Sequence, residues 1–243
     1  MKIGILETGD VNEKIVGKHG TYPQMFEMLL GSIDPSLEFQ TWHVLENQFP
    51  NAPQDADGWV VTGSRHGIYD DLPWIEPLKV FLRACLAAKV PVAGVCFGHQ
   101  ILAEAMGGHA EKSHKGWGLG IHDYTVINRP SWMKDLGLGY RGHAVHQDQV
   151  TVLPPETTVI AGSDFCKYAA LAYGDAEAPL AISVQSHPEF NPDFMTDLIE
   201  ARLRGVVPAD VAAKGEATLG GDLNNEDWAR WIVAFFRLVK SAA

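Results

Sequence analysis

Short apolar runs alternate with amphipathic segments along the first half of the chain. Runs rich in Val, Ile and Leu predict β-strands at residues 2–6, 37–44, 57–62 and 92–95. Helices are expected between them, at residues 22–30 and 73–89. In the second of these helices the apolar side chains recur at spacings of three and four, which places them on one face. This alternation favours a parallel sheet with helices on both faces, and catalytic groups then gather at the carboxyl ends of the strands.

The second half of the chain has a different rhythm, because Gly, Pro and Asp divide shorter apolar runs. Strands are expected at residues 121–127, 149–153, 158–161, 168–173 and 180–185, and helices at residues 191–204 and 225–240. Residues 205–223 are small and polar and predict a connecting segment. We therefore predict an α/β fold of three layers, with a mostly parallel central sheet, helices on both faces and a small antiparallel extension. Residues 1–243 are expected to form a single domain, with 205–243 as a C-terminal helical extension.

Residues 94–100, Gly-Val-Cys-Phe-Gly-His-Gln, join the expected strand at 92–95 to a segment that predicts a helix. A thiol at the apex of such a turn is typical of a nucleophile elbow. Gly94 and Gly98 give the close packing that the turn needs. The helix N-terminus beneath the sulfur favours the thiolate, which is the reactive form. The pattern predicts that Cys96 is a catalytic nucleophile.

A thiol nucleophile needs a base, and a group that orients the base. Of the ten histidines, His187 has the most suitable context, because it follows the apolar run at 180–184 directly. It is therefore expected at the carboxyl end of a strand, where the elbow also opens. Glu189 lies two residues further on and can accept a hydrogen bond from the imidazole. We predict a triad of Cys96, His187 and Glu189.

The motif G-x-C-x-G-H-Q, followed by His-Pro-Glu at 187–189, resembles the class I glutamine amidotransferase family of triad glutaminases. The stand-alone branch, similar to the glutaminase domain of GMP synthase, fits best. Further stretches share this resemblance, at residues 60–64, 107–108, 115–117 and 146–150. The resemblance implies a flavodoxin-like fold.

For the reaction, the resemblance implies that Cys96 attacks the γ-carboxamide of glutamine or of a γ-glutamyl compound. His187 then acts as base and afterwards as acid, and Glu189 orients it. The backbone N–H groups of Gly63 and Phe97 bind the oxyanion. The γ-glutamyl thioester is resolved by water, and ammonia or an amine leaves.

For the substrate, the resemblance implies that Gln100 faces the bound molecule and that the backbone near His146 and Gln147 holds its α-amino end. One departure concerns the oxyanion loop, which often has Gly-Pro-Gly in the family and has Gly-Ser-Arg here. Arg65 either disturbs the donor geometry or binds a substrate carboxylate.

Composition and charge indicate which partners, location and cofactors to expect. The net charge of −11 argues against a nucleic-acid or anionic-membrane partner, and no apolar run is long enough for a membrane span. Three cysteines do not make a disulfide framework, so a cytoplasmic location is expected. Pairs such as His143 with His146 lack the further ligands of a metal site, so neither a metal nor another cofactor is expected.

Three functions stay open. The third is a thiol protease or related hydrolase on a similar sheet, and the first two follow. The protein is an enzyme on γ-glutamyl amides, or a non-catalytic binding subunit of a separate synthetase. No phosphate-binding G-x-x-x-x-G-K-[ST] loop is present, and the residues after Glu189 are too few for an acceptor domain. The enzyme would therefore hydrolyse γ-glutamyl compounds by itself or supply ammonia to a synthetase subunit. The aromatic residues between 228 and 236 fit either the core or a homodimer contact.

Overall fold

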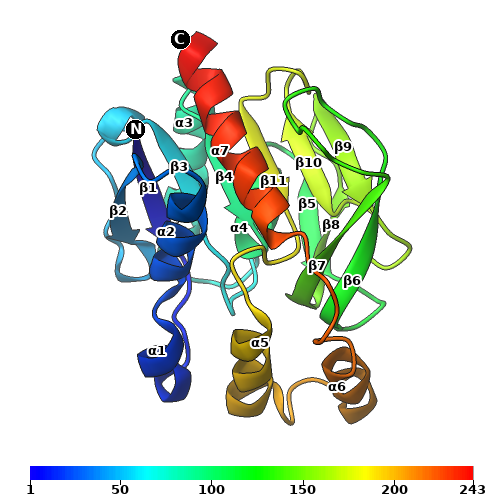
Figure 1. Cartoon of the computed structure of the whole chain (residues 1–243). Helices are drawn as coiled ribbons and strands as arrows, with labels where there is room; N and C mark the ends of the chain where they lie inside the picture. Colours follow the sequence, from blue (N-terminus) through cyan, green and yellow to red (C-terminus); the bar gives the residue numbers. More distant parts are fainter. Residues whose placement is uncertain (243) are drawn as a thin grey trace.

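The computed structural model describes residues 1–242, and its centre is a nine-stranded sheet (Figure 1). The strand order is β2-β1-β3-β4-β11-β10-β9-β6-β7. The first five strands in this order, β2, β1, β3, β4 and β11, run parallel. The pairs from β11-β10 to β6-β7 are antiparallel. The strands of this sheet are β1 (Lys2–Glu7), β2 (Glu38–His43), β3 (Gly58–Val61), β4 (Val92–Val95), β6 (Gly118–Val126), β7 (Gly139–His146), β9 (Thr157–Gly162), β10 (Ala170–Tyr173) and β11 (Ala181–Val184). A separate antiparallel pair consists of β5 (His109–Lys112) and β8 (Asp148–Val152).

Helices cover both faces of the sheet. Helix α2 (Tyr22–Ile33) and helix α7 (Asn225–Ala242) lie together on one face, as Figure 1 shows, and α3 (Ile75–Ala87) and α4 (Phe97–Ala105) lie on the other. Successive residues of a strand point to opposite faces of the sheet and so belong to two different cores. Ile5 and Val60 pack toward α2 and α7, whereas Leu6 and Val61 pack toward α3 and α4. The aromatic residues of α7 are buried in the first of these cores.

A third apolar cluster lies at the carboxyl ends of the parallel strands, at the lower end of Figure 1. It joins α1 (Glu13–His19), α5 (Pro192–Leu198) and α6 (Ala209–Glu216) to the start of α2. Helix α5 continues into a π-helical segment, Ile199–Leu203, and short 3₁₀ turns occur at Val44–Glu46 and Pro53–Asp55. This cluster forms one wall of the cavity described below.

The predicted α/β fold is confirmed, and most expected elements are present with bounds shifted by a few residues. Strands β5 and β7 and helix α1 are additions. The expectation that residues 205–223 only connect two helices is wrong, because α6 lies within them. It is fixed to β6: Thr218 Oγ1 accepts a hydrogen bond of 2.7 Å from the backbone of Ile121, and Gly215 packs closely on Leu119. No helix within residues 1–242 has the length and apolar character needed to cross a bilayer.

Candidate active site

Cys96 occupies the sharp turn between β4 and α4. Its backbone has φ 54° and ψ −102°, a conformation that few residues other than glycine adopt. The turn is possible only because its glycines pack tightly. A Cβ on Gly94 would lie 2.4 Å from the carbonyl oxygen of Gly98, and one on Gly98 would lie 2.3 Å from that of Val61. The turn therefore has the strand-to-helix geometry that residues 94–100 predict.

His187 reaches the cysteine because β11 and β4 are parallel neighbours. Val184 pairs with Val95, and the N–H of Cys96 donates to the carbonyl of Val184 at 2.9 Å, so the segments that follow both strands leave the sheet side by side. The carbonyl of His143 on β7 accepts a hydrogen bond of 2.9 Å from the N–H of His187. A Cβ built on Gly63 would lie 2.9 Å from Cε1 of His187 and 3.7 Å from Cβ of Cys96. These three residues converge on one point.

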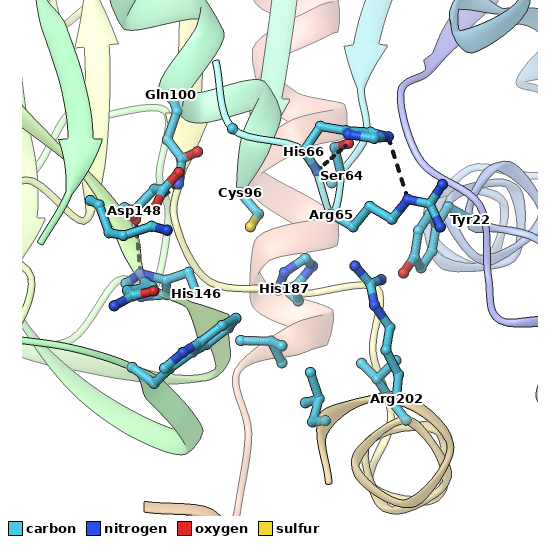
Figure 2. Close-up of a pocket in the computed structure, with 18 of the residues that line it drawn as sticks. Tyr22, Ser64, Arg65, His66, Cys96, Gln100, His146, Asp148, His187 and Arg202 are labelled. Carbon is cyan, nitrogen blue, oxygen red and sulfur yellow. Dashed lines mark hydrogen bonds between the residues drawn. The ribbon is translucent and has the colours of Figure 1, made fainter. Parts of the chain in front are cut away.

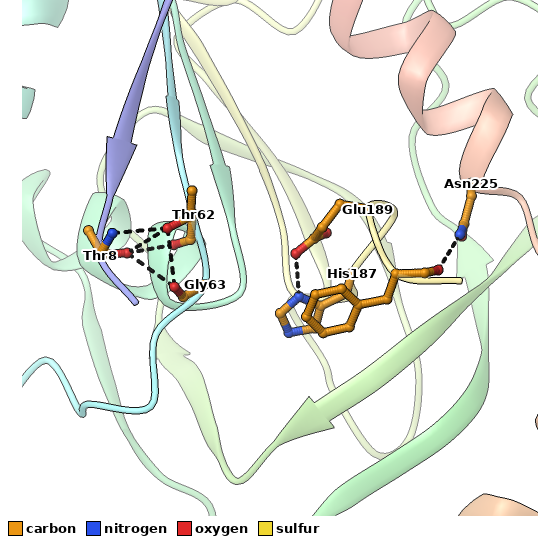
Figure 3. A network of polar contacts seen from close by, with 7 residues as sticks. Thr8, Thr62, Gly63, His187, Glu189 and Asn225 are labelled. Carbon is orange, nitrogen blue, oxygen red and sulfur yellow. Dashed lines mark hydrogen bonds and ion pairs between the residues drawn. The ribbon is translucent and has the colours of Figure 1, made fainter. Parts of the chain in front are cut away.

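The imidazole of His187 is held on two sides. Its Nδ1 lies 2.7 Å from Oε1 of Glu189, whose side chain is completely buried (Figure 3). Phe190 stacks on the ring at 4.1 Å with an interplanar angle of 4°. Burial alone would lower the pKa of His187, but the charges of Glu189 and Cys96 and hydrogen bonds to both raise it to about 10. The geometry therefore favours an imidazolium ring.

Two backbone N–H groups beside the sulfur are available as donors. Those of Gly63 and Phe97 find no acceptor within the described part of the chain. Figure 3 shows how the Gly63 loop is fixed: Oγ1 of Thr8 donates to the carbonyl of Thr62 at 2.9 Å and also lies 3.3 Å from that of Gly63. Because each peptide plane is rigid, a held carbonyl also fixes the N–H at its other end.

Cys96 opens into a cavity of about 160 Å³. On one side lie Gln100, His146 and Asp148 (Figure 2). The amide nitrogen of Gln100 donates to the carbonyl of Asp148 at 2.9 Å and to Gln185 at 3.2 Å. The cavity is also lined by Gln147, Lys112 and Tyr69. The sequence-predicted residues Gln100, His146 and Gln147 therefore line the same cavity as Cys96.

The opposite side of the cavity carries Tyr22, Arg65 and Arg202 (Figure 2). Arg65 extends toward Tyr22 and away from Cys96, and its Nε donates to the ring of His66 at 3.4 Å. The Arg65 side chain therefore lies away from the Gly63 N–H and does not disturb that donor.

Three further histidines are buried around the site. Burial lowers the pKa of His99 and His146 to about 3, and burial together with His187 lowers that of His143 to about 4. Nδ1 of His99 lies 2.7 Å from the Ser183 hydroxyl, a contact that ties α4 to β11. Across residues 1–242, no three His, Cys, Asp or Glu side chains are arranged to hold a metal ion.

Reasoning from the sequence missed several cavity residues. Asp148 stands in the His-Gln-Asp motif, and that adjacency is a usable signal. Arg202 and Tyr22 lie on helices whose direction depends on tertiary packing, and no local pattern marks them. Phe190 follows Glu189 directly, but its stacking on His187 depends on the turn that the chain makes there.

Comparison with known proteins identifies the class to which this fold and site belong. Residues 37–203 match the model of the glutamine amidotransferase class-I family. The chain belongs to that family, which confirms the resemblance carried by its motifs.

Particular relatives come from two branches. The chain is 27% identical over 221 residues to gamma-glutamyl peptidase 3 of Arabidopsis thaliana, covering 86% of this chain and 85% of the relative. It is 32% identical over 178 residues to one of the subunits of the glutamine-hydrolyzing GMP synthase of Halobacterium salinarum, covering 72% and 87%. The fold resembles that of a glutamine amidotransferase of Thermotoga maritima, with a TM-score of 0.75, 17% identity and 98% coverage of both chains.

Proposed function

We propose that this protein hydrolyses the γ-amide of glutamine or of a γ-glutamyl compound through a thioester on Cys96. The observation that carries the proposal is the convergence on one cavity of a thiol at a strained turn, a buried histidine–glutamate pair and two free N–H groups. Both branches of relatives bear names that fit this chemistry, since one is a peptidase of γ-glutamyl compounds and the other hydrolyses glutamine.

The first half of the reaction forms the thioester. The proton of the Cys96 thiol moves to His187. Glu189 stabilises the resulting imidazolium, and the raised pKa of His187 reflects this stabilisation. The thiolate then attacks the γ-carbonyl carbon, and the N–H groups of Gly63 and Phe97 receive the oxyanion. Each such donor contributes about 3 kcal/mol to related acyl transfers. His187 returns the proton to the leaving nitrogen as the carbon–nitrogen bond breaks.

The second half releases glutamate. A water molecule loses a proton to His187 and attacks the thioester, the same donors receive the oxyanion, and the carbon–sulfur bond breaks. The side chain of Glu189 keeps the imidazole in one orientation throughout, because its Oε1 accepts from Nδ1. Phe190 blocks rotation of the ring by stacking against it.

The head of the γ-glutamyl group is assigned to the wall that carries Gln100, His146, Gln147 and Asp148. The Asp148 carboxylate suits the α-amino group. The ammonium of Lys112, whose backbone pairs with Asp148 between β5 and β8, suits the α-carboxylate. The carbonyl of Gln147 already accepts a hydrogen bond of 3.0 Å from Ser113. The Asp148 carboxylate carries a negative charge that this carbonyl lacks, so it is the better partner for the amino group.

Purified protein tests the proposal directly. We expect release of ammonia from glutamine, or of the amine from γ-glutamyl amino acids, and loss of that release in Cys96→Ala. Cys166→Ala is the matched control, because burial raises the pKa of that thiol to about 12 and keeps it inert. Equal absence of activity in the wild type and in Cys96→Ala across such substrates would refute hydrolysis by the isolated chain.

Supply of ammonia to a separate synthetase is the second candidate, and the similarity to GMP synthase subunits favours it. This function requires a stable or transient partner. Affinity purification from the source cells, followed by a glutaminase assay with and without the recovered partner, tests it. A large stimulation by an ATP-dependent synthetase supports this candidate, and full activity of the isolated chain on γ-glutamyl peptides speaks for the first.

A further inference from the structure

Two arginines on the cavity wall have no carboxylate partner. Arg65 and Arg202 both line the cavity, and neither lies within ion-pair distance of an acidic side chain in residues 1–242. The chain has 30 acidic residues against 19 Lys and Arg, so carboxylates are abundant. Most of the other arginines form ion pairs with them, and Arg204, two positions after Arg202, pairs with both Glu200 and Glu216. Two guanidinium groups on the cavity wall are thus without a carboxylate partner among residues 1–242.

Arg202 and Arg204 are two positions apart, so they lie on different sides of the helical segment; Arg202 belongs to the π-helical part and Arg204 follows it. A π turn adds a residue to the helical repeat, and such turns are frequent at functional sites. Arg204 lies outward beside α6, whereas Arg202 lies on the cavity wall with Leu198 and Leu203. Arg202 is close enough to Tyr22 to lower the pKa of its hydroxyl, although burial raises that pKa overall. Figure 2 shows Arg65 on this same side, beside Tyr22.

Position relative to the triad decides which part of a substrate meets these groups. The γ-glutamyl head is assigned to the Gln100 and Asp148 wall, on the far side of Cys96 (Figure 2). The leaving nitrogen must face His187, which protonates it. His187 stacks on Phe190, and Phe190 stacks on Tyr22 at 5.8 Å, so this ring series leads from the imidazole to the arginine side. A group attached to the leaving nitrogen therefore extends toward Arg65 and Arg202.

We propose that Arg65 and Arg202 form a subsite for a carboxylate on the departing amine, so that the preferred substrates are γ-glutamyl amino acids or peptides. A guanidinium presents its N–H groups in a planar fork that matches a carboxylate. The Tyr22 hydroxyl is a further donor on the same wall. Glutamine, which releases ammonia, leaves this subsite empty. The inference rests on the proposed function, because it takes the γ-glutamyl amide as the bond that is cleaved.

Two compounds of nearly the same size isolate the carboxylate. γ-Glutamylglycine and γ-glutamylglycinamide share the acyl group and differ in the charge of the leaving amine. We expect the wild type to prefer the acid by roughly tenfold or more in kcat/KM, as for a charge-assisted hydrogen bond. This preference should fall toward unity in Arg65→Met and Arg202→Met, which keep most of the apolar stem. Arg83→Met is the matched control, because Arg83 pairs with Glu76 on α3, which lies outside the cavity.

A binding measurement separates this proposal from the proposed function. Calorimetry on Cys96→Ala compares the Kd of the two compounds without any turnover. Roughly tenfold tighter binding of the acid, lost with Arg202→Met, supports the subsite even if the wild type cleaves neither compound, an outcome that would refute the proposed function alone. Equal Kd values, no binding of either compound, or a preference that survives both arginine substitutions would overturn the subsite.

Discussion

One added methyl group at Gly63 would test the geometry of the site. The Cβ of Gly63→Ala would lie 2.9 Å from Cε1 of His187. Carbon atoms in contact normally stay about 3.5–4.0 Å apart, so the methyl group and the ring must separate by about 0.6 Å or more. Neither side moves freely. The imidazole is held by Glu189 at 2.7 Å and by Phe190 at 4.1 Å, and the Gly63 carbonyl lies 3.3 Å from the Thr8 hydroxyl.

The cost should appear mainly in catalysis. Misplacing a catalytic group by about 1 Å can reduce the rate by about 100-fold, and here the base and one oxyanion donor are both displaced. We therefore expect kcat/KM of Gly63→Ala to fall by about 100-fold. Overpacking of this kind should also lower the free energy of unfolding by about 1–3 kcal/mol. The protein should still fold.

Steady-state hydrolysis of a γ-glutamyl substrate gives the first quantity, and urea unfolding followed by circular dichroism gives the second. Gly17→Ala is the matched control, because a Cβ at that position in α1 meets nothing within 4 Å. It should leave activity unchanged and stabilise the helix by about 0.5–1 kcal/mol. Activity of Gly63→Ala within threefold of the wild type, roughly 0.6 kcal/mol in the barrier, would refute the convergence of Gly63 and His187 on the reacting carbon.

Three further predictions concern His187 and the loop that carries Gly63. Glu189→Gln should lower the pKa of His187, because one of the two charges that oppose the effect of burial is removed, and should reduce kcat/KM by roughly 100-fold; an unchanged imidazole titration by NMR would contradict this. The pKa of His187 is raised from 6.5 to about 10, so its stabilising contribution is complete below pH 6.5 and is lost as the pH rises toward 10. The free energy of unfolding of the wild type should therefore fall more steeply between about pH 7 and about pH 9 than that of His187→Gln, and parallel curves would count against the pairing. Thr8→Val should leave the buried carbonyl of Thr62 without its 2.9 Å partner, costing about 1–3 kcal/mol of stability and about tenfold in kcat, whereas a change in KM alone would argue against a role in the oxyanion loop.

The parts of the fold that could be predicted are those whose signals are local. β4 consists of four buried residues, and Gly94 within it and Gly98 after it allow the tight turn, so residues 92–100 carry their own structural information. Helix α3 shows its apolar face in the spacing of its residues. In contrast, β7 contains glycines and histidines that weaken the strand pattern, and it is a strand because it pairs with β6 along its whole length.

In the site too, residues with a local sequence signal could be predicted and residues placed by tertiary packing could not. Cys96 and the His-Pro-Glu segment follow apolar strands, and the parallel pairing of β4 with β11 explains why both ends meet. Arg202 could not be predicted, because its position on the cavity wall depends on how α5 and the segment that follows it pack against α1. Asp148 could have been predicted, since it directly follows His146 and Gln147, which the resemblance had already assigned to substrate binding.

Labelling with an electrophilic glutamine analogue, such as a chloromethyl ketone, tests the central claim most directly. Burial raises the pKa of Cys85 and Cys166 to about 12, so neither thiol should react under mild conditions. We expect mass spectrometry to show a single adduct on the peptide that contains Cys96, and no adduct in Cys96→Ala. An unlabelled Cys96, or equal labelling of all three cysteines, would contradict a nucleophile built at the end of β4 for a γ-glutamyl substrate.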